Sequence, residues 1–102
     1  MIVMDNKEEA ATIQRTSLEE PGMWEVILLN DNFTPQDFVV LVLQQIFHHS
    51  EHRAYEIMMN IHKAGEGIAG IYIKDVAGTK ADHVLKFAQA NGFPLATKLR
   101  KV

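Results

Sequence analysis

Three polar residues in a row stand between two apolar segments of this sequence. Asn30, Asp31 and Asn32 follow the strand-like run "WEVILL" and precede the helix-like run "FVVLVL". Asn and Asp favour turns because their side chains bond nearby backbone groups, and one such residue is enough for a turn. A carboxylate, amide oxygens and a neutral imidazole such as that of His62 can together accept hydrogen bonds from one ammonium group.

His62 stands beside an apolar stripe. The apolar residues of 51–64 recur at helical spacing, at Ala54, Ile57, Met58 and Ile61. His62 lies at the edge of this stripe, about 80° from Ala54 at roughly 100° per residue. A half-buried histidine bonded to a backbone carbonyl would have the same position. If the loop after the first strand faces the end of this helix, however, His62 and the polar run converge. Val39, Met58 and Leu95 would then form an apolar floor beside them.

The histidine cluster His48-His49-x-x-His52 has the residue type of a metal site but not its arrangement. Ser50 has the character of a helix start, so His48 and His52 belong to different segments. Glu51 is the one acidic neighbour, which is too few ligands for the usual zinc patterns. A solvated turn between two helices explains the cluster better, and we expect neither a metal nor a cofactor.

The remaining motifs do not favour catalysis. "GEGIAG" at 65–70 matches the glycine fingerprint of dinucleotide sites, but that fingerprint follows a strand and opens a helix, and here the order is inverted. Asp31, Asp37 and His62 could form an acid–base set. The sequence has no cysteine, no serine in an elbow motif and no phosphate loop. A binding protein is therefore expected rather than an enzyme, and a small enzyme using Asp31 and His62 is the weaker alternative.

The elements that must position these residues can be read from periodicity and from helix signals. The sequence predicts strands at 24–29, 67–73 and 95–99 and helices at 35–47, 51–64 and 75–90. Thr34 is expected to cap the first helix, with Pro35 at its first position and Asp37 completing a capping box. Ser50 is expected to cap the second helix and Gly65 to end it. The order βααβαβ predicts an α+β fold with three helices packed on a small three-stranded antiparallel sheet.

Composition limits the classes of function. The chain has 102 residues and a net charge of −3, which fits one domain and argues against nucleic acid as a partner. We expect a flexible tail at 1–22 and a core domain at 23–102. The longest apolar run, 38–43, is far too short to span a bilayer, and the start of the chain lacks the pattern of a secretory signal. With no cysteine, a cytoplasmic protein is expected.

Four stretches of the sequence resemble one family. "WEVILLNDNFTPQDFVVLVL", "AYEIMMNIHKAGEGIAGIY", "GTK" and "GFPL" are similar to the ClpS family, with order and spacing kept from about residue 23 to residue 99. Members of this family are adaptors without catalytic activity. They bind N-degron proteins, which begin with a free α-amine and a bulky apolar residue, and deliver them to the ATP-dependent protease ClpAP.

The resemblance implies a role for individual residues of this chain. The α-amine of the substrate would be held by Asn30, Asp31, Asn32 and His62. The pocket for the first side chain would be lined or supported by Ile27, Thr34, Gln36, Val39, Val42, Met58 and Leu95. Asp75 and Lys80 match positions that dock on the N-terminal domain of the ClpA-type AAA+ unfoldase. The tail would assist the transfer of substrate.

Two departures from the family text concern the site itself. Asn32 replaces an acidic residue that helps to neutralise the α-amine, and Gln36 replaces a methionine that excludes β-branched first residues. These departures predict a divergent paralogue with weaker or narrower substrate choice. A non-catalytic interaction domain of the same fold, like the C-terminal domain of the bacterial ribosomal stalk protein, is the alternative that needs neither His62 nor the polar run.

Overall fold

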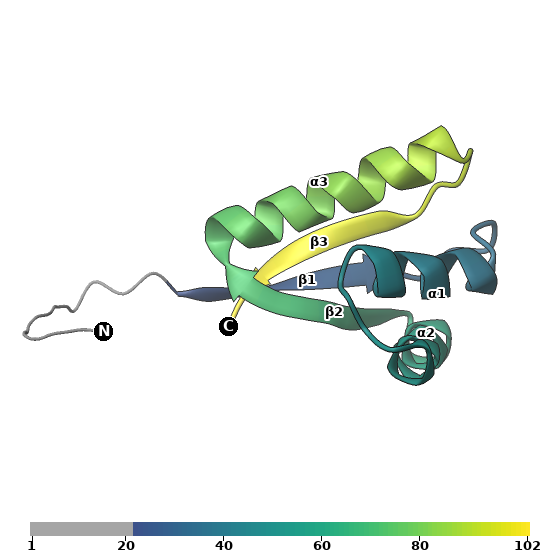
Figure 1. Cartoon of the computed structure of the whole chain (residues 1–102), viewed down its shortest axis with the longest axis horizontal. Coiled ribbons are helices and arrows are strands. Elements are labelled where there is room, and N and C mark those ends of the chain that lie inside the picture. Colours follow the sequence, from purple (N-terminus) through teal and green to yellow (C-terminus); the bar gives the residue numbers. More distant parts are fainter. Residues whose placement is uncertain (1–21) are drawn as a thin grey trace, which may run out of the picture.

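The order of elements is the one that the sequence predicts. The computed structural model describes residues 22–102, so the tail predicted for 1–22 lies outside the described residues except for Gly22. The elements are β1 Met23–Leu29, α1 Gln36–Gln45, α2 Glu51–Ala64, β2 Glu66–Ile73, α3 Lys74–Ala90 and β3 Ala96–Lys101 (Figure 1). The predicted α+β fold with three helices and a three-stranded sheet is confirmed.

The sheet has the strand order β2-β1-β3, and both pairings are antiparallel. β1 is the central strand, which fits its apolar sequence MWEVILL. Leu29 at its end pairs with Glu66 of β2 and Ala96 of β3. A bulge between Val26 and Ile27 changes the register with β2. β3, at Ala96–Lys101, starts one residue and ends two residues later than the predicted 95–99.

The three helices share one core with one face of the sheet. Val26 and Leu28 of β1 point into a cluster built from all three helices, whose buried members include Phe38, Leu43, Ala54, Ile57, Ile61, Ala77, Val84 and Ala88. In Figure 1, α3 runs along β3 while α1 and α2 lie together near the end of β1 where residue 29 is. The helices thus bring the loops that follow β1 and α2 to the same end of the molecule.

The ends of α2 are those predicted. Ser50 has an extended backbone, and its side chain accepts a hydrogen bond from Arg53 N at 3.1 Å. Gly65 follows the helix with φ of 91°, a left-handed conformation that costs glycine little.

The start of α1 differs from the prediction. Thr34 is not the cap: the cap residue is Pro35, which makes no side-chain cap bond, and the helix begins at Gln36. The Thr34 hydroxyl donates instead to the carboxylate of Asp31 at 2.8 Å. A charged acceptor forms the stronger hydrogen bond, so the hydroxyl bonds Asp31 and leaves the helix terminus without it.

The described helices also bear on the membrane question. Between residues 22 and 102 no helix is both long enough and apolar enough to cross a bilayer.

Candidate functional site

The loop that carries the polar run is fixed to the end of α2. Asn30 N donates to the carbonyl oxygen of Gly65 at 2.9 Å, and Gly65 is the residue that ends the helix bearing His62. This bond continues the pairing of Leu29 with Glu66 beyond the end of the strand. The sheet register and the helix stop therefore place the loop after β1 against the carboxyl end of α2.

Asp31 organises this loop. Its Oδ1 accepts hydrogen bonds from Phe33 N at 2.8 Å and from Thr34 N at 2.7 Å, and its Oδ2 accepts from the Thr34 hydroxyl. Burial alone would raise the pKa of this carboxyl, but the hydrogen bonds from Thr34 and Phe33 outweigh burial and hold its pKa below the ordinary value. The negative charge on Asp31 is thus a fixed part of the loop that carries Asn30.

The other predicted site residues differ in exposure: we call the exposed polar residues the rim and the buried apolar residues the floor. Asn30, Asn32, Gln36 and His62 are exposed. The floor residues are Val39, Met58 and Leu95, with 7%, 3% and 3% of their surface exposed, and all three belong to one buried cluster. Exposed polar lone pairs together with an apolar layer would suit a ligand with one charged and one apolar end.

Two predicted residues lie apart from this rim and floor. Ile27 alternates with Val26 and Leu28 along β1, so its side chain lies on the opposite face of the sheet, outside the core cluster. Val42 is fully buried within the cluster, which makes it a support beneath the floor rather than a contact surface.

The two residues predicted for protease docking share one groove on α3. Asp75 and Lys80 line a cavity of about 290 Å³ together with Val76, Thr79 and His83. The Lys80 ammonium does not point freely into solvent, because Nζ donates to the carbonyl oxygen of Ile46 at 2.7 Å. It also lies 5.5 Å from the ring centroid of Tyr72. Lys80 therefore joins α3 to the end of α1 as well as lining the groove.

The histidine cluster has structural contacts. His49 Nε2 donates to the carbonyl oxygen of Ala69 at 2.6 Å, and His52 lies in α2 beside Glu56 at 3.3 Å. His48 stands in the loop before α2 with φ of 62°. Within residues 22–102 no three His, Cys, Asp or Glu side chains are grouped as metal ligands.

A groove between α1 and α2 was not predicted from the sequence. It has a volume of about 580 Å³ and is lined by Asp37, Val40, Glu51, His52 and Tyr55.

Comparisons with known proteins agree with one another. Residues 19–98 match the family model described as ATP-dependent Clp protease adaptor protein ClpS. The adapter protein ClpS of Deinococcus radiodurans is 48% identical over 84 residues, which cover 82% of this chain and 74% of that protein. The ClpS of Burkholderia mallei is 38% identical over 97 residues, which cover 93% of each chain. Among solved structures, Agrobacterium tumefaciens ClpS2 bound to L-phenylalaninamide matches with a TM-score of 0.79 and 34% identity, covering 81% of this chain and 100% of that one.

Proposed function

The chain belongs to the ClpS family of adaptors of the ATP-dependent Clp protease, and from this premise we propose that it binds N-degron proteins and delivers them to ClpAP. The ligand is a free α-amine followed by a bulky apolar side chain. The protein contributes recognition, and the protease carries out the chemistry. The partner in this proposal is the N-terminal domain of a ClpA-type unfoldase, and the place of action is the cytoplasm.

One observation carries the proposal: the bond from Asn30 N to Gly65 O, which fixes the polar loop at the end of α2 that bears His62. We call the junction of this loop with the carboxyl end of α2 the corner. Its possible acceptors for an ammonium group are the amide oxygen of Asn30 and an imidazole nitrogen of His62. The solved relative is bound to L-phenylalaninamide. That compound has a free α-amine and an apolar aromatic side chain, which are the two features that the rim and the floor match.

The expected binding energy is divided between these two features. A hydrogen bond to a charged group contributes about 1.5–3 kcal/mol. Burying a Leu or Phe side chain contributes another 1.5–3 kcal/mol, approximately. Association costs at least about 4 kcal/mol. Neither contribution is sufficient alone, so the site tests for a chain terminus and for an apolar first residue at once.

Asp31 acts indirectly in this scheme. Three of its hydrogen-bond contacts are already made within the loop. Its charge lies one residue from Asn30 and favours a cation at the rim through space. Because Asn32 supplies only a neutral amide, the loop presents one carboxylate, and binding weaker than that of a loop with two carboxylates is expected.

The proposal is tested by calorimetric titration with a peptide that begins with Phe, beside the same peptide acetylated at its amine. Binding of the free peptide and none of the acetylated one is expected. His62→Ala should weaken binding of the free peptide at least tenfold, since it removes about one charge-assisted bond. His83→Ala on α3 makes the same change in side chain away from the corner and should leave the affinity unaltered. Equal binding of both peptides, or none of either, would favour an interaction domain without N-degron recognition.

A further inference from the structure

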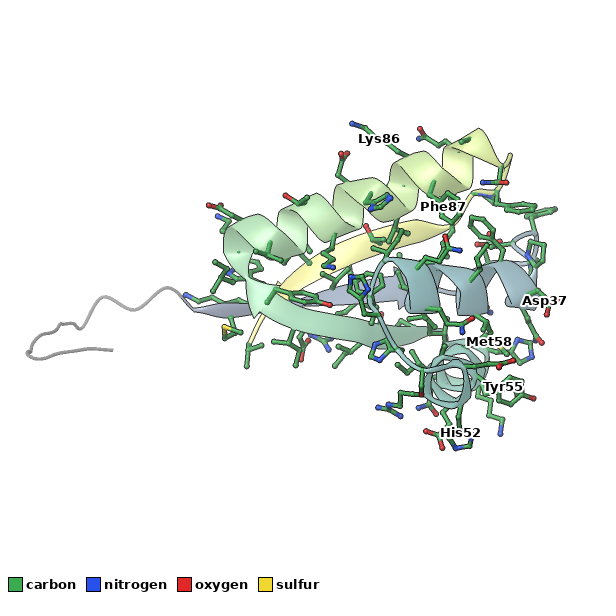
Figure 2. The ribbon with its side chains drawn as sticks, viewed as in Figure 1. Asp37, His52, Tyr55, Met58, Lys86 and Phe87 are labelled. Carbon is green, nitrogen blue, oxygen red and sulfur yellow. The ribbon has the colours of Figure 1, made fainter. Side chains whose placement is uncertain are left out.

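The groove between α1 and α2 continues the corner described above. On α1, the groove residues Asp37 and Val40 are the immediate neighbours in sequence of Gln36 and Val39, which belong to the rim and the floor. On α2, Tyr55 is three residues before Met58 and seven before His62. At about 100° per residue, these three positions fall within about 60° of one another around the helix. Figure 2 shows Asp37, Met58 and Tyr55 at the same end of the molecule, with His52 below them.

The groove has an acidic character that its own contacts do not neutralise. Asp37 and Glu51 lie in the first turns of α1 and α2, where the helix dipole stabilises a negative charge. Within residues 22–102 neither carboxylate forms an ion pair with a lysine or arginine. Among the groove residues, His52 approaches the carboxylate of Glu56 at 3.3 Å, and Glu56 does not line the groove. Asp37 and Glu51 therefore line a groove of about 580 Å³ without a lysine or arginine partner from the part of the chain that the structure describes.

Tyr55 gives this acidic groove an aromatic wall. More than half of its surface, 55%, is exposed, and Val40 contributes an apolar surface beside it. An aromatic ring next to carboxylates suits the flat guanidinium group of arginine, which can stack on the ring while its donors reach the oxygens.

We propose that this groove is a second subsite, which takes an arginine or lysine side chain from the third or fourth residue of the bound N-degron. The inference rests on the proposed function. The distance along α2 sets the position in the peptide: seven residues at about 1.5 Å each separate His62 from Tyr55. An extended peptide covers about 3.3–3.6 Å per residue, so its third or fourth residue reaches Tyr55 when the α-amine is at His62. Substrates would then be selected by charge downstream of the first residue as well as by the first residue.

The experiment uses four Phe-initiated peptides that differ only at the third and fourth positions, which carry Arg, Lys, Ala or Glu. Exposed charge pairs are weak, so the Arg peptide should bind about three- to tenfold more tightly than the Ala peptide, and the Glu peptide more weakly than either. Raising the salt concentration should reduce these differences and leave the Ala peptide almost unaffected.

Variants then locate the effect. The double change Asp37→Asn and Glu51→Gln should abolish the preference for Arg while changing the affinity for the Ala peptide less than twofold. Asp82→Asn, which removes the same charge from α3, should preserve the preference. Tyr55→Leu should make Arg and Lys equivalent.

Two results would overturn the subsite. If all four peptides bind equally, the subsite is wrong and the first-residue site remains. A preference for Arg that persists in the Asp37→Asn and Glu51→Gln variant would also show that the subsite is wrong. If no Phe-initiated peptide binds, the proposed function fails, and the subsite fails with it.

Discussion

Asp31 holds together the loop that follows β1, and in the proposed site it would act without touching the ligand. Its carboxylate accepts from two backbone amides and one hydroxyl within three residues, so the loop backbone is folded around the charge. The loop in turn is fixed to α2 through the amide of Asn30. The position of Asn30 therefore depends on a loop that the carboxylate of Asp31 holds together.

We expect Asp31→Ala to lower the free energy of unfolding by about 1–3 kcal/mol, because it leaves the amides of residues 33 and 34 without an acceptor. It should also weaken peptide binding by loosening the loop. Chemical denaturation with peptide titration measures both effects. Asn32→Ala, which removes a neighbouring side chain for which no such contacts occur among the described residues, is the matched control and should change stability little.

The effect of Asp31→Ala on the free energy of unfolding should depend on pH. The hydrogen bonds hold the folded-state pKa of Asp31 below its ordinary value of 3.8. A lowered pKa stabilises the folded protein above the unfolded-state value, and the contribution is lost as pH falls through the folded-state value. The stability difference between the native protein and Asp31→Ala should therefore be constant at neutral pH and shrink below about pH 4. A difference that stays constant to pH 2 would contradict this assignment.

At the scale of elements, Gly65 and Gly78 differ in whether the backbone requires glycine. Gly65 ends α2 with a positive φ of 91°, while Gly78 lies inside α3. A Cβ built at Gly78 meets no atom within 4 Å. Neither close packing nor an unusual backbone angle requires glycine at that position. Glycine therefore makes α3 less stable than an alanine at the same position would.

Gly78→Ala should raise the free energy of unfolding by up to about 1 kcal/mol, since glycine is that much less favourable than alanine in a helix interior. Gly65→Ala is the contrasting variant. It should lower stability by about 1–2 kcal/mol, because a side chain is strained at positive φ. Urea denaturation of the two variants gives the comparison, and a destabilising Gly78→Ala would show that its backbone is constrained.

At the scale of the whole molecule, Lys80 connects elements that are distant in the sequence. Its ammonium donates a hydrogen bond to the carbonyl oxygen of Ile46 just after α1, where the helix dipole favours a cation.

On the opposite face of the sheet, long charged side chains form ion pairs between strands. Arg100 pairs with Glu25 at 2.7 Å and Lys98 with Glu66 at 2.8 Å, and Ile27, which lies among these strands, is fully buried. Lys98 is the residue of β3 that pairs with Ile27, and the aliphatic stem of a lysine can cover apolar surface while its ammonium reaches an acidic partner.

Lys80→Met keeps the aliphatic stem and removes the ammonium. It should destabilise the fold by about 1.5–3 kcal/mol, because a charge-assisted bond is lost and a carbonyl is left without its donor. Lys86→Met on the same helix removes only an exposed pair with Asp82 and should cost less than about 1 kcal/mol. Thermal unfolding compares the two variants. Equal effects would mean that the bond between Lys80 and Ile46 contributes little to stability.

The sequence by itself determined the order of elements and the core stripe of α2. Period-two and helical patterns are local, and so are the signals of Ser50 and Gly65, which depend on the backbone within one turn. For the same reason the sequence indicated which side chains could accept bonds from an ammonium group. It was wrong about the start of α1, because Thr34 had two acceptable hydrogen-bond partners and only the fold of the loop decided between them.

Only the tertiary structure decided which of these residues meet. The bond between Asn30 and Gly65 joins positions 35 residues apart, and it follows from the pairing of β1 with β2. The face on which Ile27 lies, the attachment of Lys80 to α1 and the groove at Tyr55 likewise depend on packing between elements. Local sequence preferences carry no information on such distances, since contacts between elements are set by how their apolar faces fit together.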